Sequence, residues 1–464
     1  MNMYAIGSIR TQIQYYSHIE NGIGNYSQGD SAHAEGANTI AEGVASHAEG
    51  SSTAAKGIAS HAEGANATAR ADYSHVEGAN TLANGISSHA EGNSTVTYGN
   101  NSHAEGSHTI TGIPNNSLQG DSAHAEGAHT IAEGVASHAE GSNTAAKGIA
   151  SHAEGFATNA HGDFSHAEGS YTTTGDSEEP LQGNSSHAEG YFTIAHGDFS
   201  HSEGYFTLSR GESSHAEGLY TVARGKASHA EGAHTQSNGD FSHVEGVGNL
   251  SEFEGAHIMG KYGDAQEPYS WFIGNGLSST SREVGAKWLA STRNMYIDGN
   301  TYVASGTGYA EMFKIKNEII DVGFFVTFDG EYIRRATDQD DYILGITNDT
   351  SSILGNSAEM RWKEKYLVDE WGRIQHENHG TSGIIKKKAV LNPKWDPKKE
   401  YTPRRERVEW VSVGLLGQIR VRDDGTCEVG AYCSPNIEGV ATKSKRGYPV
   451  IQRITSNQII ILFK

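Results

Sequence analysis

The sequence predicts an all-β protein: a narrow parallel β-roll followed by a separate β-rich domain. Two observations carry this prediction. A pentad of the type Ser-His-Ala-Glu-Gly recurs through residues 31–246, and its histidines are 14 residues apart in all but two steps of 21. All six Trp lie after residue 270, so the composition changes near residue 250. Self-similarity at a short fixed period is the mark of a solenoid, and we divide the chain accordingly.

The first segment, residues 1–30, precedes the full repeats, and we interpret it as an attachment or cap segment. It begins MNMYAIGSIRTQIQYY, which has no charged stretch followed by an apolar one. A secretory signal peptide has that pattern. We therefore expect synthesis in a reducing cytoplasm. The two cysteines, Cys427 and Cys433, are too few for a disulfide framework and have no nearby histidines that would suggest a zinc site.

The second segment, residues 31–246, is the repeat shaft. Two glycines in each period and the lack of an apolar heptad stripe argue against a coiled coil. Two short strands per 14-residue coil suit a β-roll, in which successive coils pair about 4.8 Å apart. Strand alternation then places Ser46, Ala48 and Gly50 inside the coil. The same alternation leaves His47 and Glu49 on the outer face.

So narrow a coil admits only small side chains and buries little apolar area. We therefore expect burial to come from a homotrimer that packs its His/Glu faces around an axis. We expect the axial side chains to include His47, Glu49, His61, Glu63, His138 and Glu140. We favour a structural role for them, as a hydrogen-bonded polar seam. The alternative is an ion on the axis, and no other metal or cofactor is expected.

The net charge of −21 lies almost entirely in the shaft. Residues 31–246 hold 26 acidic and six basic side chains. Nucleic acid is an unsuitable partner for so acidic a body, because phosphate affinity comes mainly from Lys and Arg. No apolar run approaches the length of a membrane span, so membrane insertion is not expected. Both steps of 21 contain Leu-Gln-Gly and a proline, and we interpret each as one added half-unit.

Over roughly residues 15–260 the repeats resemble the heads of YadA-like trimeric adhesins, whose pentad is typically Ser-Val-Ala-Ile-Gly. The period, the corner glycines and the central Ala all match. The resemblance implies a left-handed parallel β-roll with three chains side by side. In that family the Val and Ile form an apolar trimer core. Here His and Glu take their places, so the resemblance implies a polar one.

The third segment, residues 247–307, is interpreted as a transition and cap region. Residues 256–260 and 271–274 follow the repeat pattern but are more apolar than the shaft. Beyond it, alternating and β-branched runs predict strands at 324–328, 342–346, 411–421 and 459–463.

The fourth segment, residues 308–464, carries a second resemblance. Its motifs are Gly308-Tyr-Ala-Glu-Met-Phe313, Phe325-Val-Thr-Phe-Asp-Gly330 with Asp340-Asp-Tyr-Ile-Leu-Gly-Ile346, and the run from Trp410 to Cys427. They resemble the self-cleaving intramolecular-chaperone domain of phage pre-neck appendage and tail-spike proteins, which is classed with glutamic-type peptidases. Members of that family assemble as trimers and then cut ahead of an Asp-Tyr/Phe-Ala-Glu motif.

Carried over, the resemblance implies a scissile bond between Thr307 and Gly308, with Glu311 as the catalytic carboxylate. Gly308 replaces the leading Asp of the motif; if this departure slows the cut, Gly308→Asp should speed it. A carboxylate three residues beyond the bond has a high effective molarity. Glu311 can act as general base toward water or the Thr307 hydroxyl, helped by burial between chains.

Other residues of this segment have weaker interpretations. Asp340 or Asp341 is an acid partner or, more simply, part of a turn. Glu311 itself has a plainer interpretation as a solvated charge at a strand end. The basic stretches 386–388 and 394–407 are interpreted as solvated loop, with a nucleotide-phosphate contact as the alternative.

Together these observations favour a phage or prophage tail appendage, a receptor-binding fibre located in the virion tail and made in the bacterial cytoplasm. Its expected partners are two further copies of itself, other tail or baseplate proteins, and a glycan or protein receptor on the host surface. Its only enzymatic activity is a single self-cleavage, without an external substrate. The alternatives are a trimeric adhesin of the host cell and a fibre that keeps the domain as a permanent cap. A polysaccharide-degrading spike needs a carboxylate pair that the uniform repeat glutamates do not single out.

Overall fold

The computed structural model describes residues 18–19, 23–114, 116, 119–176, 182–299, 305–316, 318–358, 365–379, 386–396, 398 and 400–464. Most of the predicted N-terminal segment, residues 1–17 and 20–22, lies outside these. The chain divides into two compact units, residues 1–299 and 300–464, and each is described by itself. Among the described residues, none belongs to a helix long and apolar enough to cross a membrane.

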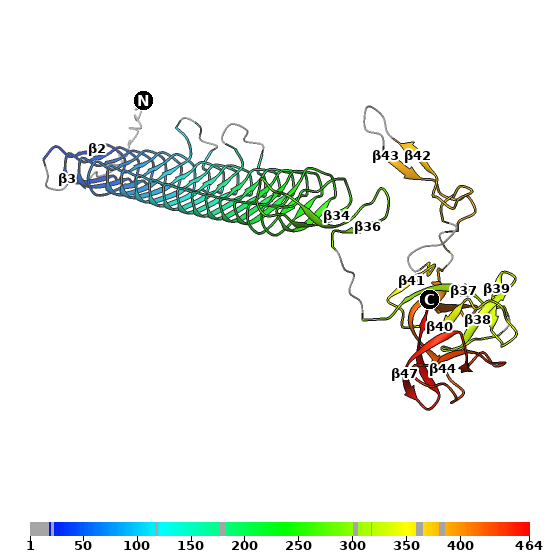
Figure 1. Ribbon diagram of the computed structural model, residues 1–464. Coiled ribbons are helices and arrows are strands. Elements are labelled where there is room, and N and C mark those ends of the chain that lie inside the picture. Colours follow the sequence, from blue (N-terminus) through cyan, green and yellow to red (C-terminus); the bar gives the residue numbers. More distant parts are fainter. Residues whose placement is uncertain are drawn as a thin grey trace, which may run out of the picture. The chain divides into compact units, whose positions relative to one another are not determined.

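The first unit is a β-roll whose coils stack along one direction (Figure 1). One of its two sheets is built from the pentads: β1 (His18–Ile19), β3 (His33–Ala37), β5 (His47–Ser51), β7 (His61–Ala62), β9 (His75–Ala79), β11 (His89–Asn93), β13 (His103–Ser107), β15 (His124–Ala128), β17 (His138–Ser142), β19 (His152–Phe156), β21 (His166–Ser170), β23 (His187–Tyr191), β25 (His201–Tyr205), β27 (His215–Leu219), β29 (His229–Ala230), β31 (His243–Val244), β33 (His257–Lys261) and β34 (Trp271–Asn275).

The second sheet of the roll consists of two-residue strands, one in each coil. They are β2 (Tyr26–Ser27), β4 (Ile40–Ala41), β6 (Ala54–Ala55), β8 (Thr68–Ala69), β10 (Leu82–Ala83), β12 (Val96–Thr97), β14 (Ile110–Thr111), β16 (Ile131–Ala132), β18 (Ala145–Ala146), β20 (Asn159–Ala160), β22 (Thr173–Thr174), β24 (Ile194–Ala195), β26 (Leu208–Ser209), β28 (Val222–Ala223), β30 (Gln236–Ser237) and β32 (Leu250–Ser251).

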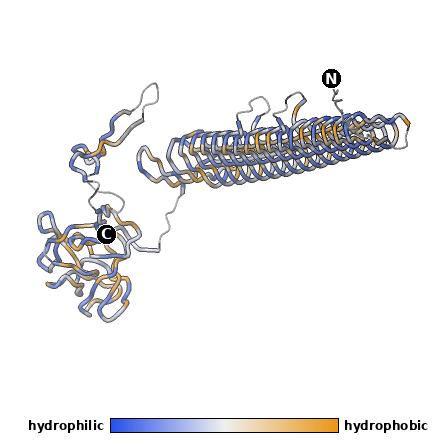
Figure 2. Tube along the Cα trace, turned by 180° about the vertical axis from the view of Figure 1, so that it is seen from behind, coloured by the Kyte–Doolittle hydropathy of each residue, from blue (hydrophilic) through white to orange (hydrophobic). Residues whose placement is uncertain are grey.

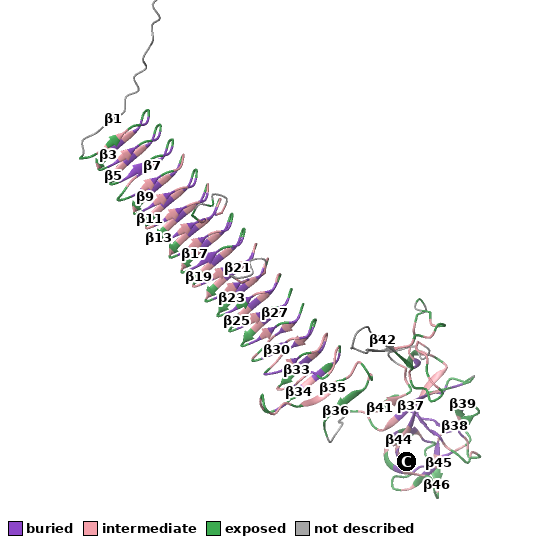
Figure 3. Ribbon diagram, turned by 90° about the horizontal axis from the view of Figure 1, so that it is seen from above, coloured by how far each residue is buried: buried purple, intermediate pink, exposed green. Residues whose placement is uncertain are grey.

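The register of the pentad sheet stacks each residue on its equivalent in the next coil. In β11 and β13, for example, His89 pairs with His103 and Glu91 with Glu105. Buried and partly exposed residues alternate along each pentad strand (Figure 3), and hydrophobic and hydrophilic residues alternate along the coils (Figure 2). Ala48 is fully buried, whereas His47 and Glu49 are about one-third exposed. The predicted parallel β-roll with an interior of small side chains is confirmed.

Each coil turns at two corners, and in most coils a glycine precedes each of them. The pentad glycine has a positive φ itself, as in Gly50 with φ 108°, and at both corners the residue two positions after the glycine is left-handed, as in Ala45 with φ 56° after Gly43. The amide of Ala45 donates to the carbonyl of Asp30 in the preceding coil, at 2.8 Å. Glycine is also needed for stacking, because a Cβ on Gly43 would lie 1.8 Å from the carbonyl oxygen of Gly57.

The two insertions do not form half-units, and that prediction was wrong. Strand β13 pairs directly with β15 and β14 with β16, so the first insertion adds no strand to either sheet. The second behaves alike, since β21 pairs with β23 and β22 with β24. The coils on either side of both insertions are therefore stacked in register. Leu118, Pro180 and Leu181 lie outside the described residues.

The last coils of the roll become more apolar and end in an antiparallel cap. Val244, Ile258 and Phe272 take interior positions that Ala holds in most coils, and all three are fully buried. Strand β34 then pairs antiparallel with β35 (Val284–Trp288), which pairs with β36 (Met295–Ile297). Antiparallel strands replace the parallel stacking here, so the pentad sheet of the roll stops at this end.

The second unit is a bent antiparallel sheet ordered β39-β38-β40-β44-β48-β47-β45-β46, with β37 between β44 and β41. Its elements are β37 (Tyr309–Lys314), β38 (Phe325–Asp329), β39 (Tyr332–Arg335), β40 (Gly345–Thr347), β41 (Ile353–Gly355), β42 (His376–His379), β43 (Lys386–Ala389), the 3-10 turn Arg404–Glu406, β44 (Trp410–Arg422), β45 (Tyr432–Pro435), β46 (Ala441–Ser444), β47 (Tyr448–Thr455) and β48 (Gln458–Phe463). Strand β44, of 13 residues, links the two halves of the sheet. Phe325, Ile346 and Ile461 are among the fully buried residues of the core.

Candidate functional site

The predicted cleavage segment lies at the start of β37, in the second unit. Thr307 and Gly308 immediately precede this strand, and Glu311 is its third residue. Strand β37 runs parallel to β41 and antiparallel to β44, so that Glu311 is paired with Gly355 on one side and Val413 on the other. A strand held on both sides fixes the position of the carboxylate relative to the backbone just before it.

Gly308 has a backbone conformation that favours glycine. Its φ is +77°, and a Cβ at this position would lie 2.3 Å from the carbonyl oxygen of Leu416. On β44, Gly417 has φ +113°, and a Cβ there would lie 2.7 Å from the Cα of Gly308. The two backbones thus approach at glycines, next to a bulge in the pairing of β37 with β44. The expectation that Gly308→Asp speeds cleavage is therefore revised, because this backbone has no space for a side chain.

Hydrogen bonds hold the same segment from two directions. The Thr307 hydroxyl donates to the carbonyl of Gln418 at 2.8 Å. The amide of Ser352 donates to the carbonyl of Gly308 at 3.1 Å, and its hydroxyl donates to the carbonyl of Gly306. Because the Thr307 hydroxyl is already engaged, water is the better candidate for a nucleophile.

The Glu311 carboxylate has a partner on its own strand. Tyr309 lies two residues earlier and therefore on the same face of β37, and its hydroxyl donates to Oε1 of Glu311. This hydrogen bond raises the pKa of Tyr309. Glu311 is partly buried. The hydrogen bond from Tyr309 orients Oε1 of Glu311, and Oε2 can then accept a proton.

The two aspartates suggested as acid partners do not fit that role. Asp340 accepts two hydrogen bonds from the Arg334 guanidinium, at 2.6 and 2.9 Å, and another from the amide of Thr337. The hydrogen bonds from Arg334 are the main reason that the pKa of Asp340 lies far below its usual range. A carboxylate kept ionised in this way is a poor proton donor. Asp341 is exposed. The plainer interpretation of the pair as a turn fits the structure better.

The basic stretches suggested for a nucleotide phosphate are only partly described. The side chains of Lys386–Lys388 lie outside the described residues. Arg404 is buried, donates to the carbonyl of Asn356 at 2.7 Å and packs on the ring of Trp410. Its guanidinium is therefore occupied within the domain.

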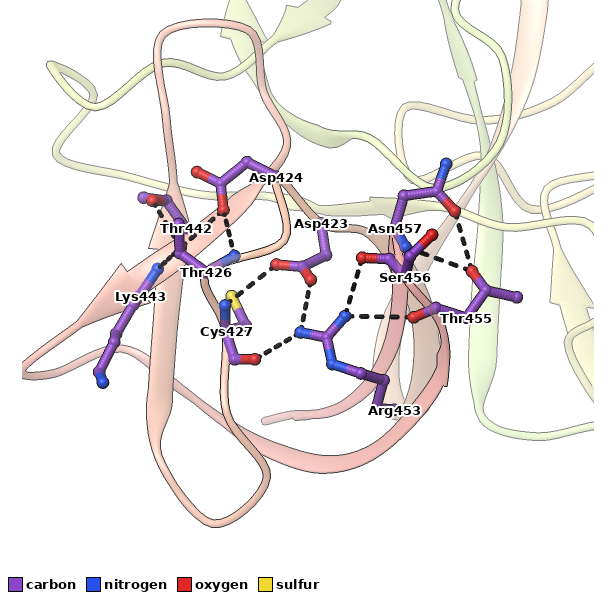
Figure 4. A network of polar contacts seen from close by, with 10 residues as sticks. All are labelled: Asp423, Asp424, Thr426, Cys427, Thr442, Lys443, Arg453, Thr455, Ser456 and Asn457. Carbon is purple, nitrogen blue, oxygen red and sulfur yellow. Dashed lines mark hydrogen bonds and ion pairs between the residues drawn. The ribbon is translucent and has the colours of Figure 1, made fainter.

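A buried ion pair joins the residue after β44 to β47 (Figure 4). The Asp423 side chain is fully buried, and its Oδ2 lies 2.6 Å from Nη2 of Arg453. Arg453 also donates to the carbonyls of Thr455 and Ser456, each at 3.1 Å. Cys427 and Cys433 are both free thiols, and burial raises the pKa of each. Buried, protonated thiols are unreactive, so this cluster is structural.

A second candidate site is the His/Glu ladder on the outer face of the pentad sheet. Its sixteen imidazole rings stack with centroids 4.6–5.0 Å apart. They belong to His33, His47, His61, His75, His89, His103, His124, His138, His152, His166, His187, His201, His215, His229, His243 and His257. The glutamates beside them line a groove that runs at least from Glu91 to Glu189. The structure thus brings the predicted ladder residues onto one face, including Glu49, Glu63 and Glu140.

Stacking moves the pKa values within the ladder in opposite directions. Burial, followed by the like charge of neighbouring rings, lowers the pKa of His61 and His138. Hydrogen bonding to the glutamates above and below raises the pKa of Glu63 to about 7, whereas the same contact lowers the pKa of Glu49. Adjacent carboxyl groups so close together share a proton, and burial among like rings disfavours the charged form of His61 and His138.

Sequence reasoning missed Tyr309, Ser352 and Gly417 as parts of the cleavage segment's surroundings. Tyr309 carried a signal, since residues two apart on a strand share a face. Ser352 and Gly417 are 45 and 109 residues from Thr307 and Gly308, and only the fold brings them there. Their contacts could not be inferred without the pairing of β37 with β41 and β44.

Part of this chain is similar to parts of known phage proteins. Residues 264–459 match the Peptidase_G2 family, described as an IMC autoproteolytic cleavage domain. The pre-neck appendage protein of Bacillus phage B103 is 34% identical over 173 residues, which are 36% of this chain and 20% of that protein. The preneck appendage protein of Bacillus phage PZA is 36% identical over 152 residues, 32% of this chain and 17% of that protein. The chain spans about a fifth of the length of these curated relatives.

Among solved structures, the C-terminal fragment of bacteriophage phi29 gene product 12 is similar at 33% identity. The match covers 34% of this chain and 99% of that fragment, with a TM-score of 0.31. The matches confirm the predicted resemblance to phage appendage proteins with a C-terminal self-cleaving domain. The family match begins at residue 264, earlier than the predicted boundary, and so includes β34, β35 and β36.

Proposed function

We propose that this chain is a subunit of a trimeric phage-tail appendage whose C-terminal domain cuts the bond between Thr307 and Gly308 once. Glu311 is the catalytic residue, and the reaction has no external substrate. The observation that carries the proposal is the placement of Glu311 three residues beyond this bond, on a strand held between β41 and β44. The matched autoproteolytic family supports the same reaction class.

The proposed chemistry is a hydrolysis in which Glu311 transfers a proton. Its carboxylate accepts a proton from a water molecule as that water attacks the carbonyl carbon of Thr307. The same proton then passes to the nitrogen of Gly308 as the C–N bond breaks. The products are a carboxylic acid at Thr307 and an amine at Gly308, which exchange a proton to become carboxylate and ammonium, and Glu311 returns to its ionised form. Holding the carboxylate and the bond in one segment supplies the proximity that a separate base lacks.

The proposal of a homotrimer rests on what the roll leaves exposed. Its interior holds mainly Ala, Ser and Thr, which bury little apolar area in one chain. An aromatic stripe runs along one corner of the coils, with Tyr191 stacked on Tyr205 and Phe192 on Phe206 at 5.2 and 4.8 Å. These rings are more than one-third exposed. Packing the stripe and the His/Glu ladder against two further copies covers both.

As a tail appendage, the protein belongs to the virion, where it contacts other tail or baseplate proteins. The shaft then holds a receptor-binding part away from the particle and toward a glycan or protein on the host surface. The acidic charge of the shaft supports a role away from nucleic acid.

The test is the Glu311→Gln substitution, which keeps the shape of the side chain and removes the base. We expect the wild-type chain to yield two fragments on denaturing gels and the Glu311→Gln chain to stay whole. Glu331→Gln, at an exposed glutamate in the turn between β38 and β39, is the matched control and should cut like the wild type. Cleavage of the Glu311→Gln chain at the wild-type rate would remove Glu311 from the mechanism.

A further inference from the structure

The His/Glu ladder repeats one arrangement of potential metal ligands along the whole roll. In each repeat, one glutamate lies between the histidine of its own coil and the histidine of the next. At least five such groups have their three ligand atoms within 4.8 Å of one another, among them His89, Glu91 and His103. A single uniform face therefore offers imidazole nitrogen and carboxylate oxygen together in nearly every coil.

Glu217 shows the geometry most clearly. One of its carboxylate oxygens lies 3.9 Å from Nε2 of His215, and the other lies 3.9 Å from Nε2 of His229. Ligand atoms about 2.1 Å from a shared zinc ion are at most about 4.2 Å apart. Both nitrogen–oxygen separations are already below that limit. The two imidazole rings stack 4.7 Å apart, so both must tilt toward each other to bring the three atoms around one ion, and each side chain is about one-third exposed.

The Nε2 nitrogens of this group lie among ladder carboxylates, and Nε2 of His215 is also 3.6 Å from an oxygen of Glu203. The Nε2 atoms of His215 and His229 are shielded from solvent, yet they make no hydrogen bond. A buried polar atom without a partner costs free energy. Because the same Nε2 position recurs in successive coils, the roll needs an interaction that compensates for this cost. The shaft also carries 26 acidic against six basic side chains in residues 31–246, so its field attracts cations.

We propose that the His/Glu ladder binds first-row transition-metal dications, with Zn²⁺ as the preferred ion, each held by Nε2 of two successive histidines and the glutamate between them. Imidazole together with carboxylate suits zinc and its neighbours, whereas Mg²⁺ and Ca²⁺ require oxygen ligands. Water completes the coordination. Each histidine offers one Nε2, so the sixteen stacked histidines hold at most eight ions in one chain.

The experiment uses the full chain, freed of metal by a chelator and then titrated with Zn²⁺. Bound zinc is counted by elemental analysis after gel filtration, and Co²⁺ is used in parallel as an optical probe. We expect several ions per chain, no displacement by excess Mg²⁺, and Co²⁺ absorption bands typical of coordination by fewer than six ligands. A wild-type chain that retains no zinc, or that loses it to Mg²⁺, overturns the proposal.

Two double variants locate the ions. His215→Gln with His229→Gln removes ligands from the ladder and should lower the zinc count by at least one ion per chain. His108→Gln with His129→Gln is the matched control, because these two rings also stack, at 4.7 Å, but are exposed and outside the ladder. Equal zinc in both variants contradicts the assignment. Should the ladder variant fail to fold, as judged by circular dichroism, the ion count and the Co²⁺ spectrum of the wild type decide the question.

Discussion

The approach of two glycine backbones at the cleavage segment gives a prediction whose size can be worked out. Replacing Gly308 by Ala places a Cβ 2.3 Å from the carbonyl oxygen of Leu416 on a residue whose φ is +77°. The left-handed conformation alone costs about 1–2 kcal/mol for a residue other than glycine. Relieving the contact also displaces β37 from β44 and weakens hydrogen bonds worth about 0.5–1.5 kcal/mol each. We expect the free energy of unfolding of this domain to fall by about 2–3 kcal/mol.

Gly330→Ala is the matched control for that measurement. Gly330 has φ +65° in the turn between β38 and β39, but no atom lies within 4 Å of the position of its Cβ. Substituting Gly330 should lower the free energy of unfolding only by the cost of the left-handed conformation, about 1 kcal/mol. Both variants are compared by urea unfolding, followed by tryptophan fluorescence, in the Glu311→Gln background so that the bond stays intact. A Gly308→Ala chain no less stable than the Gly330→Ala chain would refute the close approach as the reason for glycine at position 308.

Three further predictions concern other parts of the molecule. The roll, freed of metal, should melt at a lower temperature as pH drops below about 6.5, because the pKa of His61 and His138 is lowered in the folded chain. The raised pKa of Glu63 acts the other way, through a contribution lost as pH rises from about 4.5 to about 7, but the lowered pKa of its neighbour Glu49 offsets it. A melting temperature that does not change between pH 5 and pH 8 contradicts this. Arg453→Met leaves the buried carboxylate of Asp423 unpaired and should cost about 3–5 kcal/mol in calorimetry, unlike Lys443→Met, which breaks an exposed ion pair with Glu428. Tyr309→Phe removes the hydrogen bond to Glu311 and should slow self-cleavage by about tenfold without preventing it, and an unchanged rate excludes a positioning role for Tyr309.

Much of the roll could be predicted because its pattern repeats. Alternation along one pentad separates Ala48 from His47 and Glu49, and the 14-residue period then fixes the same choice in every coil. The strands of the second unit also followed from their composition, as the predicted run 411–421 lies within β44. The prediction for the two insertions failed because a step of 21 residues fits an added half-unit as well as it fits a segment that pairs with neither sheet.

The cleavage segment could be located but not described from the sequence. The motif at Gly308 to Phe313 indicates which bond and which carboxylate to consider. The reason for glycine at position 308 lies in Leu416 and Gly417, which are more than 100 residues away and meet it only through sheet pairing. The bidentate contact of Asp340 with Arg334 likewise depends on the turn after β39. Long-range contacts of this kind have no local signature.

The central claim is that the chain cuts itself between Thr307 and Gly308, and the intact mass of the purified wild-type protein tests it most directly. The account predicts a C-terminal fragment of 157 residues that begins Gly-Tyr-Ala-Glu, together with its N-terminal complement that ends at Thr307. The same preparation of the Glu311→Gln chain should show a single mass for all 464 residues. A wild-type chain that remains whole after assembly, or a fragment that begins at another residue, would contradict the account.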